Sequence, residues 1–277
     1  MINLNRAAIA AAMCVALPGV ASAASSSAIA TGLAIPSSPS AALASTATTL
    51  AIPAGQGRAF EIPARGRAII VDAASARLYM LEDGQVRDSM RVIVGKPQAA
   101  TPMLASTIHY ATLNPYWNVP ADLAQKIIAP LVLKFGLGYL DDRGYEVVDR
   151  FGPDARILPA KDVNWRKVAA GTETVFLRER PSPHNSMGEI KFGFANDSGI
   201  YLHDTPKKEL FSEASRQLSN GCVRLEDAPR LARWMLGRDP QVSSDEPEQY
   251  VALPRGVPIV ITYLDQETPT QIASLGN

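Results

Sequence analysis

Alternating and continuous runs of apolar residues from residue 65 onward predict a domain built mainly of β-strands. Runs that are rich in branched and aromatic residues and are separated by turn residues are typical of strands. Such runs occur at Ala68–Asp72, Arg77–Leu81, Val86–Val94, Thr107–Leu113, Tyr145–Asp149, Val175–Arg178, Ile190–Phe194, Ile200–His203 and Val257–Leu264. We therefore expect about eight to ten strands around a single hydrophobic core.

Two other segments repeat apolar residues at the spacing of a helix. Ala121–Phe135 carries one such stripe, in which Pro130 is expected to kink or divide the helix, and Glu226–Leu236 carries the other. A third helix over Pro206–Ser215 would return the chain after the strand that ends at His203. The predicted fold class is therefore mainly β with a few helices, an α+β domain.

The first 64 residues have a different pattern and are not expected to belong to the folded domain. Residues 1–23 have the features of a cleavable export signal, with a basic start, a short apolar run and a small-residue end at Ala21-Ser22-Ala23. The apolar run is too short to span a bilayer. Residues 24–64, rich in Ala, Ser, Thr and Pro, predict a flexible tether. The folded domain is then expected at 65–266, followed by a C-terminal tail at 267–277.

The charge of the chain argues against one class of partner. Lys+Arg and Asp+Glu number 27 each, so the formal net charge at pH 7 is zero. Binding to a phosphate backbone needs a basic surplus or a basic stripe. A nucleic-acid partner is therefore not expected, and neither is a stable membrane span in the mature chain.

The chain contains two cysteines, of which one would remain after export. Cys14 lies inside the predicted signal, whereas Cys222 lies in the polar segment SRQLSNGCVRLED. Cysteines in an oxidising compartment usually form disulfides, but one cysteine cannot do so within its own chain. Cys222 is then a small buried apolar residue, an intermolecular link or a reactive thiol.

A reactive thiol needs a base, because a free thiol is mostly protonated at neutral pH. The chain offers three histidines: His109 inside a strand, His184 in a polar loop and His203 at the end of a strand. Strand ends and the loops after them commonly display reactive groups. His203 is therefore the candidate base for Cys222, although a hydrogen-bonded surface histidine is the alternative interpretation.

The neighbours of the cysteine suggest further roles. Gly221 permits a tight turn, and its backbone N–H with that of Cys222 would stabilise an oxyanion; a plain loop glycine is the alternative. Arg224 shares a face with Cys222 if the segment is extended, so it would hold a substrate carboxylate or else pair with a nearby acid. Ser219 either orients a histidine, which we favour, or caps a turn.

Several segments taken together resemble a known enzyme family. IYLHDTPKKELF followed by RQLSNGCVRLED is similar to the active-site signature of L,D-transpeptidases with the YkuD-type catalytic domain, in which H-x-T-P precedes [ST]-H-G-C-[IV]-R. VGKPQAATPMLASTIHYATLNPYWNVP and RERPSPHNSMGEIKFGFANDSGIYLHDTP extend the resemblance over residues 67–264. The subgroup it resembles is that of the periplasmic 3–3 crosslinking enzymes of Gram-negative bacteria. The resemblance implies a YkuD-like β-sandwich or mixed-sheet catalytic domain and a periplasmic location.

The resemblance also implies a reaction. Cys222 would attack the stem peptide of peptidoglycan before its terminal D-alanine, and His203 would act as general base and then as acid. The amine of a second stem peptide would resolve the thioester into a 3–3 crosslink; a protein amine is another possible acceptor. No metal or organic cofactor is implied, and carbapenems are expected to acylate the cysteine. With water as acceptor the same site would be an L,D-carboxypeptidase, and a catalytically weak wall-binding module is a third reading.

One position departs from the family pattern. Asn220 stands where the family usually has a histidine before Gly-Cys. Asparagine keeps hydrogen-bonding groups but does not titrate near neutrality. If the missing imidazole carried a proton, the enzyme would be slower or would favour another acceptor such as water.

Other side chains are candidates for substrate binding. Tyr201 and Lys191 lie on the approach to His203, and Trp117 belongs to the segment NPYWNVP. They would line the donor site together with Asn220 and Arg224. Packing within the sheet or the core is the alternative for Tyr201 and Trp117.

Overall fold

A computed structural model describes residues 50–54, 58–241, 246–264 and 272. The predicted signal peptide lies outside the described residues, as does most of the predicted C-terminal tail. The predicted tether, 24–64, is described only in part. Within it, β1 (Leu50–Ala54) and β2 (Arg58–Ile62) pair as antiparallel strands. Ile62 is buried in the same cluster as Ile70, so ordered structure begins before the predicted start at residue 65.

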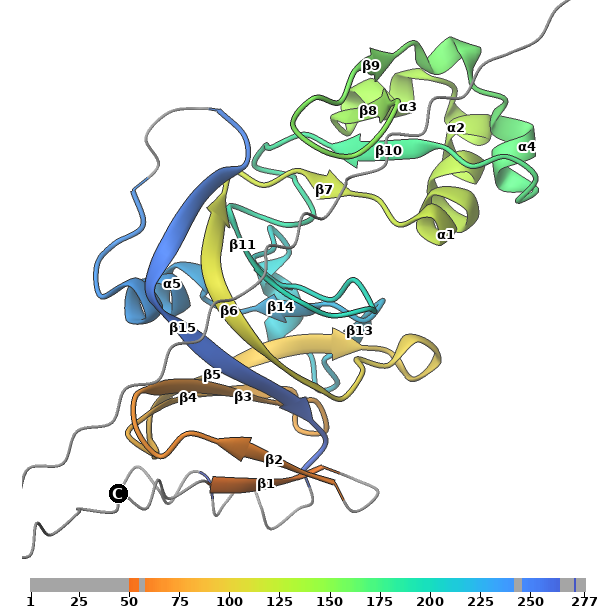
Figure 1. Cartoon of the computed structure of the whole chain (residues 1–277). Helices are drawn as coiled ribbons and strands as arrows, with labels where there is room; N and C mark the ends of the chain where they lie inside the picture. The colour runs from red at the N-terminus through yellow and green to blue at the C-terminus, as the bar shows by residue number, and fades with distance from the viewer. Residues whose placement is uncertain (1–49, 55–57, 242–245, 265–271, 273–277) are drawn as a thin grey trace, which may run out of the picture. The chain divides into compact units, whose positions relative to one another are not determined.

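A large mixed sheet forms the main part of the described chain (Figure 1). Its strands are β3 (Arg67–Asp72), β4 (Arg77–Glu82), β5 (Gln85–Gly95), β6 (Leu104–Leu113), β11 (Ile190–Phe194), β12 (Leu202–His203), β13 (Gln217–Ser219), β14 (Val223–Leu225) and β15 (Gln249–Thr262). The order is β13-β5-β14-β12-β11-β6-β15-β3-β4, and β4 also pairs with β5, so the sheet closes on itself. The prediction of a mainly-β fold with a few helices is confirmed.

The alternation of side chains along the strands divides the buried residues of the sheet into two clusters. On β3, Ile69 and Val71 belong to the larger cluster, whereas Ala68 and Ile70 face the other side. Helix α5 (Ala228–Leu236) covers the larger cluster with one apolar face. The helix starts at Asp227, whose carboxylate accepts the backbone N–H of Arg230, and it ends at a left-handed glycine.

A third hydrophobic cluster lies in the segment between β6 and β11, so the expectation of a single core is wrong. We call residues 117–179 the insert. It contains a four-stranded sheet in the order β7-β10-β8-β9 and helices that cover one face of that sheet (Figure 1). Its elements are β7 (Trp117–Asn118), α1 (Ala121–Leu123), η2 (Ala124–Ile128), α2 (Ala129–Phe135), α3 (Gly138–Asp142), β8 (Tyr145–Val148), β9 (Ile157–Leu158), η3 (Ala160–Asp162), α4 (Trp165–Ala169) and β10 (Phe176–Glu179).

Other differences from the predicted elements have local causes. The expected count of strands is too low for the described residues, because several strands have only two or three residues and show no periodicity. β15 begins at Gln249, well before the predicted start at Val257. Pro254 and Gly256 interrupt the apolar run at the point where the pairing of β15 with β6 shifts register. The helix over 121–135 is continuous but widens to π-helical turns just before Pro130, which has no N–H to donate. Two short turns complete the structure, η1 (Pro97–Ala99) and η4 (Lys208–Ser212), the latter within the helix expected at 206–215.

Candidate active site

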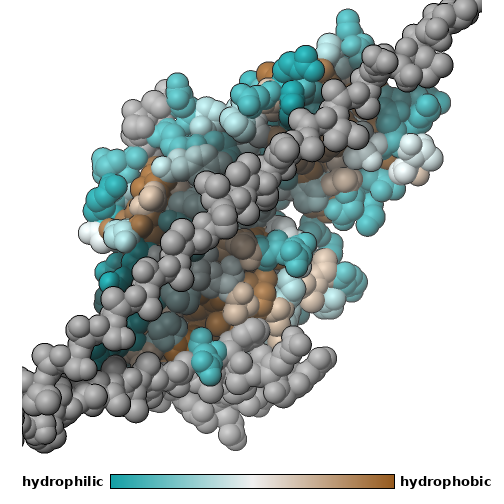
Figure 2. Space-filling view, in the orientation of Figure 1, coloured by the Kyte–Doolittle hydropathy of each residue, from teal (hydrophilic) through white to brown (hydrophobic). Residues whose placement is uncertain are grey.

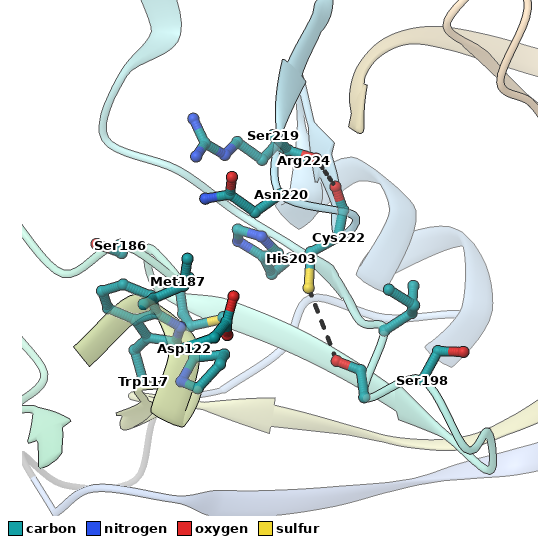
Figure 3. A pocket seen from close by; sticks show the side chains of 14 residues that line it. Trp117, Asp122, Ser186, Met187, Ser198, His203, Ser219, Asn220, Cys222 and Arg224 are labelled. Carbon is teal, nitrogen blue, oxygen red and sulfur yellow. Dashed lines mark hydrogen bonds between the residues drawn. The ribbon is translucent and has the colours of Figure 1, made fainter. Parts of the chain in front are cut away.

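A cavity of about 240 Å³ collects most of the side chains that the sequence analysis singled out. Its wall combines residues of the large sheet with residues of the insert (Figure 3). The residues that line it are Trp117, Pro120, Asp122, Leu123, Ser186, Met187, Ser198, Gly199, Ile200, His203, Ser219, Asn220, Cys222 and Arg224.

Cys222 lies in a turn that is held on both sides by the same strand. β13 pairs with β5 in parallel and β14 pairs with β5 in antiparallel orientation, so residues 220–222 reverse the chain at the end of β5. Gly221 makes this reversal with φ +119°, a conformation that side chains disfavour. A Cβ at this position would also lie 3.1 Å from Ile200 Cδ1. The turn therefore favours glycine because of its φ, and a Cβ would in addition require Ile200 to shift slightly.

Ser219 stabilises the turn and has no hydrogen bond to His203. Its hydroxyl donates to the backbone carbonyl of Cys222 at 2.6 Å and accepts the backbone N–H of Gly221 at 3.1 Å. The role we favoured for Ser219, orienting a histidine, is therefore wrong, and the alternative of turn capping holds. The Gly221 N–H is already engaged, so it is not free to bind an oxyanion as we expected. Thr101 ties the other side of the turn, accepting Gly95 N–H and donating to Gly221 O, both at 2.8 Å.

The thiol of Cys222 is partly buried and points toward a loop that leads into β12. Its Sγ lies 3.9 Å from the carbonyl oxygen of Gly199 (Figure 3). Asn196 fixes that loop, because its side chain bonds the carbonyls of Phe194 and Ile200 and accepts the N–H of Ile200. Burial raises the pKa of the Cys222 thiol, while the backbone at Tyr201 and the charge of Arg224 act in the opposite direction. The thiol is thus protonated at neutral pH and needs a base in order to attack.

His203 is buried at the end of β12 as a neutral imidazole. Burial, followed by the positive charge of Arg224, lowers its pKa to about 4. Its Nδ1 lies 2.5 Å from the carbonyl oxygen of Asp204. A carbonyl only accepts hydrogen bonds, so the proton of the neutral ring is on Nδ1 and Nε2 carries a free lone pair. His203 and Cys222 line the same cavity, so its wall contains both a proton acceptor and a thiol.

The backbone that orients His203 is braced by the next residue. The carboxylate of Asp204 accepts a hydrogen bond from Lys208 Nζ at 2.6 Å and from the backbone N–H of Glu189 at 3.1 Å. Gly188 lies so close that a Cβ there would come within 2.4 Å of the Asp204 carboxylate. Any larger residue at 188 would displace Asp204 and, with it, the carbonyl that fixes the tautomer of His203.

Arg224 supplies a positive charge that has no acidic partner among the described residues. The nearby acids are engaged elsewhere: Glu226 pairs with Arg91, and Asp227 pairs with Arg230 at 3.3 Å. Burial lowers the pKa of the Arg224 guanidinium. The alternative that Arg224 forms a salt bridge with its acidic neighbours is therefore wrong, and the charge is available to an anion in the cavity.

Comparison with known proteins gives the family of the chain. The sequence profile of the YkuD family, the L,D-transpeptidase catalytic domain, matches residues 66–261. The chain belongs to this family. A candidate L,D-transpeptidase of Haemophilus influenzae is 30% identical over 175 residues, which cover 63% of this chain. The chain spans only 35% of the length of that relative.

Solved structures with the same family name resemble the chain more distantly. An L,D-transpeptidase from Mycobacterium smegmatis is 16% identical, with 78% of this chain and 67% of that one covered and a TM-score of 0.35. The catalytic domain of an Enterococcus faecium L,D-transpeptidase acylated by ertapenem is 12% identical, with 71% and 97% covered and a TM-score of 0.35.

Most, but not all, of the predicted site residues of this YkuD-family domain line the cavity. Cys222, His203, Ser219, Asn220, Arg224 and Trp117 line the cavity, whereas Tyr201, Lys191 and Gly221 are not among its lining residues. Lys191 is paired with His203 across β11 and β12, and its Nζ binds Glu248 at 3.1 Å and lies 5.6 Å from the Tyr201 ring. Lys191 thus acts on the site through its charge, which contributes to lowering the pKa of His203.

No second imidazole takes the place of the family histidine at Asn220 among the cavity residues. His184 is exposed and lies outside the lining, so it does not compensate. Asn220 is itself exposed and is one of the residues that line the cavity. His203 is therefore the one imidazole in the wall of the cavity.

The insert contributes cavity residues that sequence reasoning missed. Asp122 and Leu123 come from α1, and Pro120 precedes it. Ser186 and Met187 come from the segment just before β11. No local pattern marks Pro120, Asp122 and Leu123, because the fold of the insert places them in the wall of the cavity.

The described part of the chain lacks the features of two other kinds of site. None of its helices has the length and apolar character to cross a membrane. Within the same described residues, three or more His, Cys, Asp or Glu side chains nowhere gather in a way that would hold a metal ion.

Proposed function

We propose that the chain is a peptidoglycan L,D-transpeptidase that forms 3–3 crosslinks through a thioester on Cys222. Membership of the YkuD family supports the reaction class. The finer assignment rests on the cavity, in which a protonated thiol, a neutral imidazole and an unpaired guanidinium occur together. It also rests on the predicted export signal, from which we propose a periplasmic location.

In the acylation step, Nε2 of His203 accepts the thiol proton as the sulfur attacks the carbonyl carbon that precedes the terminal D-alanine. Arg224 binds the carboxylate of that D-alanine by paired hydrogen bonds. The C–N bond then breaks, the imidazolium returns its proton to the leaving amine, and free D-alanine departs. A thioester remains on Cys222.

In the second step, a neutral amine of another stem peptide attacks the thioester carbon. A new C–N bond forms, the C–S bond breaks, and the proton lost by the amine passes through His203 to the departing thiolate. The cysteine and the imidazole return to their starting protonation states. No oxidant, reductant or further co-reactant is consumed.

One observation carries this proposal: buried His203, with Nδ1 against the carbonyl oxygen of Asp204, lines the same cavity as Cys222. A histidine whose pKa is about 4 is deprotonated throughout the physiological range. With its Nδ1 proton committed to Asp204 O, its one free lone pair belongs to the cavity that Cys222 lines. A wall-binding module would have no use for a base held beside a thiol.

A second candidate is hydrolysis of the same thioester, which would make the chain an L,D-carboxypeptidase. The observation in its favour is Asn220, which is exposed at the cavity in place of an imidazole and offers hydrogen bonds to water. The two candidates share the acylation step and differ only in the acceptor.

Product analysis separates these candidates. The purified chain is incubated with disaccharide-tetrapeptide muropeptides, and the products are identified by mass spectrometry. Transpeptidation gives D-alanine and dimers with 3–3 linkage, whereas hydrolysis gives D-alanine and monomeric tripeptide. Unchanged substrate, together with no covalent adduct from a carbapenem, would exclude both.

The matched variants are Cys222→Ala and Ser212→Ala. We expect the first to abolish D-alanine release and the carbapenem adduct, because the nucleophile is gone. Ser212 is exposed at the end of η4 and does not line the cavity, so the second variant should behave as the parent chain.

A further inference from the structure

The cavity carries opposite charges on two walls. Among the described residues that line it, Asp122 is the one carboxylate and Arg224 is the one permanent cation. Arg224 belongs to β14, beside Cys222, whereas Asp122 belongs to α1 of the insert. Figure 3 shows Asp122 next to Trp117 and Met187, facing the side that holds Cys222. A ligand that fills the cavity therefore meets an anion-binding group and a cation-binding group.

The carboxylate of Asp122 is only lightly engaged by the protein. Its one ion pair is with Lys126 Nζ at 3.7 Å, and both side chains are largely exposed, at 59% and 67%. Exposed pairs of this kind are weak, because water screens the charges and the long lysine must be ordered. Lys126 is therefore a weak competitor for a cation that binds to Asp122 from the cavity.

We propose that Asp122 binds the ammonium group of the incoming acceptor and thereby favours an amine over water as the group that resolves the thioester. The inference rests on the proposed function and specifies its acceptor as a cationic amine, such as the free amino group of a diamino acid. Asp122 is a specificity-determining residue in this scheme. The ammonium gives one proton to bulk water before the C–N bond forms, and the neutral amine then attacks as in the second step above.

The donor occupies the opposite wall for a geometric reason. Arg224 in β14 lies two positions after Cys222, and both side chains line the cavity. The carboxylate of the leaving D-alanine, next to the scissile bond, fits that cation. After D-alanine leaves, the wall formed by the insert remains for the second substrate, and the carboxylate on that wall is Asp122.

This arrangement also gives a role to the departure at Asn220. With one imidazole in the wall of the cavity, the site has no second titratable ring to attract or deprotonate the acceptor. A carboxylate from the insert supplies attraction for the cation without supplying a base. Selection of the acceptor then depends on charge in the insert, while the chemistry stays with His203 and Cys222.

The experiment measures how the acyl-enzyme divides between acceptors. The full chain and Asp122→Asn are given a tetrapeptide donor with one of two added amines: a tripeptide with a free diamino-acid amine, which is cationic at pH 7, or hydroxylamine, which is neutral. The ratio of amide product to hydrolysed product is measured by mass spectrometry. We expect Asp122→Asn to lower the ratio about fivefold for the cationic amine, the effect of one partly exposed charge pair, and to leave it unchanged for hydroxylamine.

Two further variants test the assignment. Asp122→Glu keeps the carboxylate and should recover most of the ratio. Asp141→Asn removes an exposed carboxylate of the same insert, in α3, that does not line the cavity, and it should leave the ratio as in the parent chain.

The outcomes distinguish this inference from the proposed function. If the parent chain releases no D-alanine from any donor, the proposed function is wrong and the inference falls with it. If the parent chain is active and Asp122→Asn leaves the ratio for the cationic amine unchanged, the inference alone is wrong. A loss confined to the rate of D-alanine release would assign Asp122 to the donor and would also overturn it.

Discussion

The turn that carries Cys222 and the insert that carries Asp122 line one cavity, but they hold their side chains in different ways. The turn is fixed by hydrogen bonds from Ser219 and Thr101 and by a glycine that no other residue replaces without strain. Asp122 is exposed and has a single weak ion pair. The turn that carries the proposed nucleophile is therefore held by several hydrogen bonds. Asp122, the residue proposed to bind the second substrate, is held only by a weak ion pair.

The two regions also differ in how they bury apolar surface. The large sheet is covered on both faces near the site, and His203, Leu202 and Val223 are almost fully buried. The insert has its own smaller cluster and carries most of the large apolar side chains that are exposed among the described residues. The members in the insert are Ile127, Leu133, Phe135, Leu137, Phe151, Ile157, Leu158 and Phe176. In the view of Figure 2 its surface is mostly teal, with small brown patches.

The largest effect is expected from the imidazole that the sheet holds. His203→Gln keeps a neutral hydrogen-bonding side chain but removes the base, so acylation of Cys222 by a carbapenem should slow about 10²- to 10⁴-fold. The rate is followed by intact-protein mass spectrometry. His184→Gln, in an exposed loop outside the cavity, should acylate at the parent rate. Acylation of His203→Gln within twofold of the parent rate would show that another group accepts the thiol proton.

The sequence predicted the sheet better than the insert for a physical reason. The strand at Ala68–Asp72 begins with a continuous apolar run because both of its faces are buried, and its limits agree with β3 to within one residue. The limits predicted for Ile190–Phe194 agree with β11. The insert builds its cluster from short elements, of which β7 and β9 have two residues each. Elements of that length are stabilised by packing, which leaves no periodic signal along the chain.

The residues of the candidate site also differ in how well the sequence could predict them. The motif around Cys222 and His203 could be found from the sequence because nucleophile, glycine and arginine follow one another in a short segment. The role of Ser219 could not, since the choice between orienting a histidine and capping a turn depends on where one hydroxyl points. Asp122 left no signal, because an exposed acid at the start of a helix is common and only the fold of the insert turns it toward the thiol.

A matched pair of core truncations compares the two regions directly. Leu202 in β12 and Leu177 in β10 are both fully buried, so each change to alanine should cost about 2–5 kcal/mol of unfolding free energy. Leu202→Ala removes support next to His203, and we expect it to slow carbapenem acylation as well. Leu177→Ala loosens only the cluster of the insert, so acylation should stay near the parent rate.

Denaturant unfolding and acylation kinetics on the same samples test this pair. If Leu177→Ala slows acylation as much as Leu202→Ala does, the expected difference between the insert and the large sheet is wrong. That result would mean that the insert helps to align the thiol and the imidazole, beyond recognising the acceptor.

The smallest effect is expected at the turn itself. Gly221→Ala places a Cβ at φ +119° and 3.1 Å from Ile200, so we expect a loss of about 1–3 kcal/mol in unfolding free energy and a displaced thiol that acylates more slowly. Gly138→Ala is the matched control in the insert, where nothing lies within 4 Å of the added Cβ. It should be neutral or slightly stabilising, because alanine restricts the unfolded chain. Equal stability of the two variants would show that the turn tolerates a side chain, and that the sheet does not hold Cys222 as tightly as its hydrogen bonds imply.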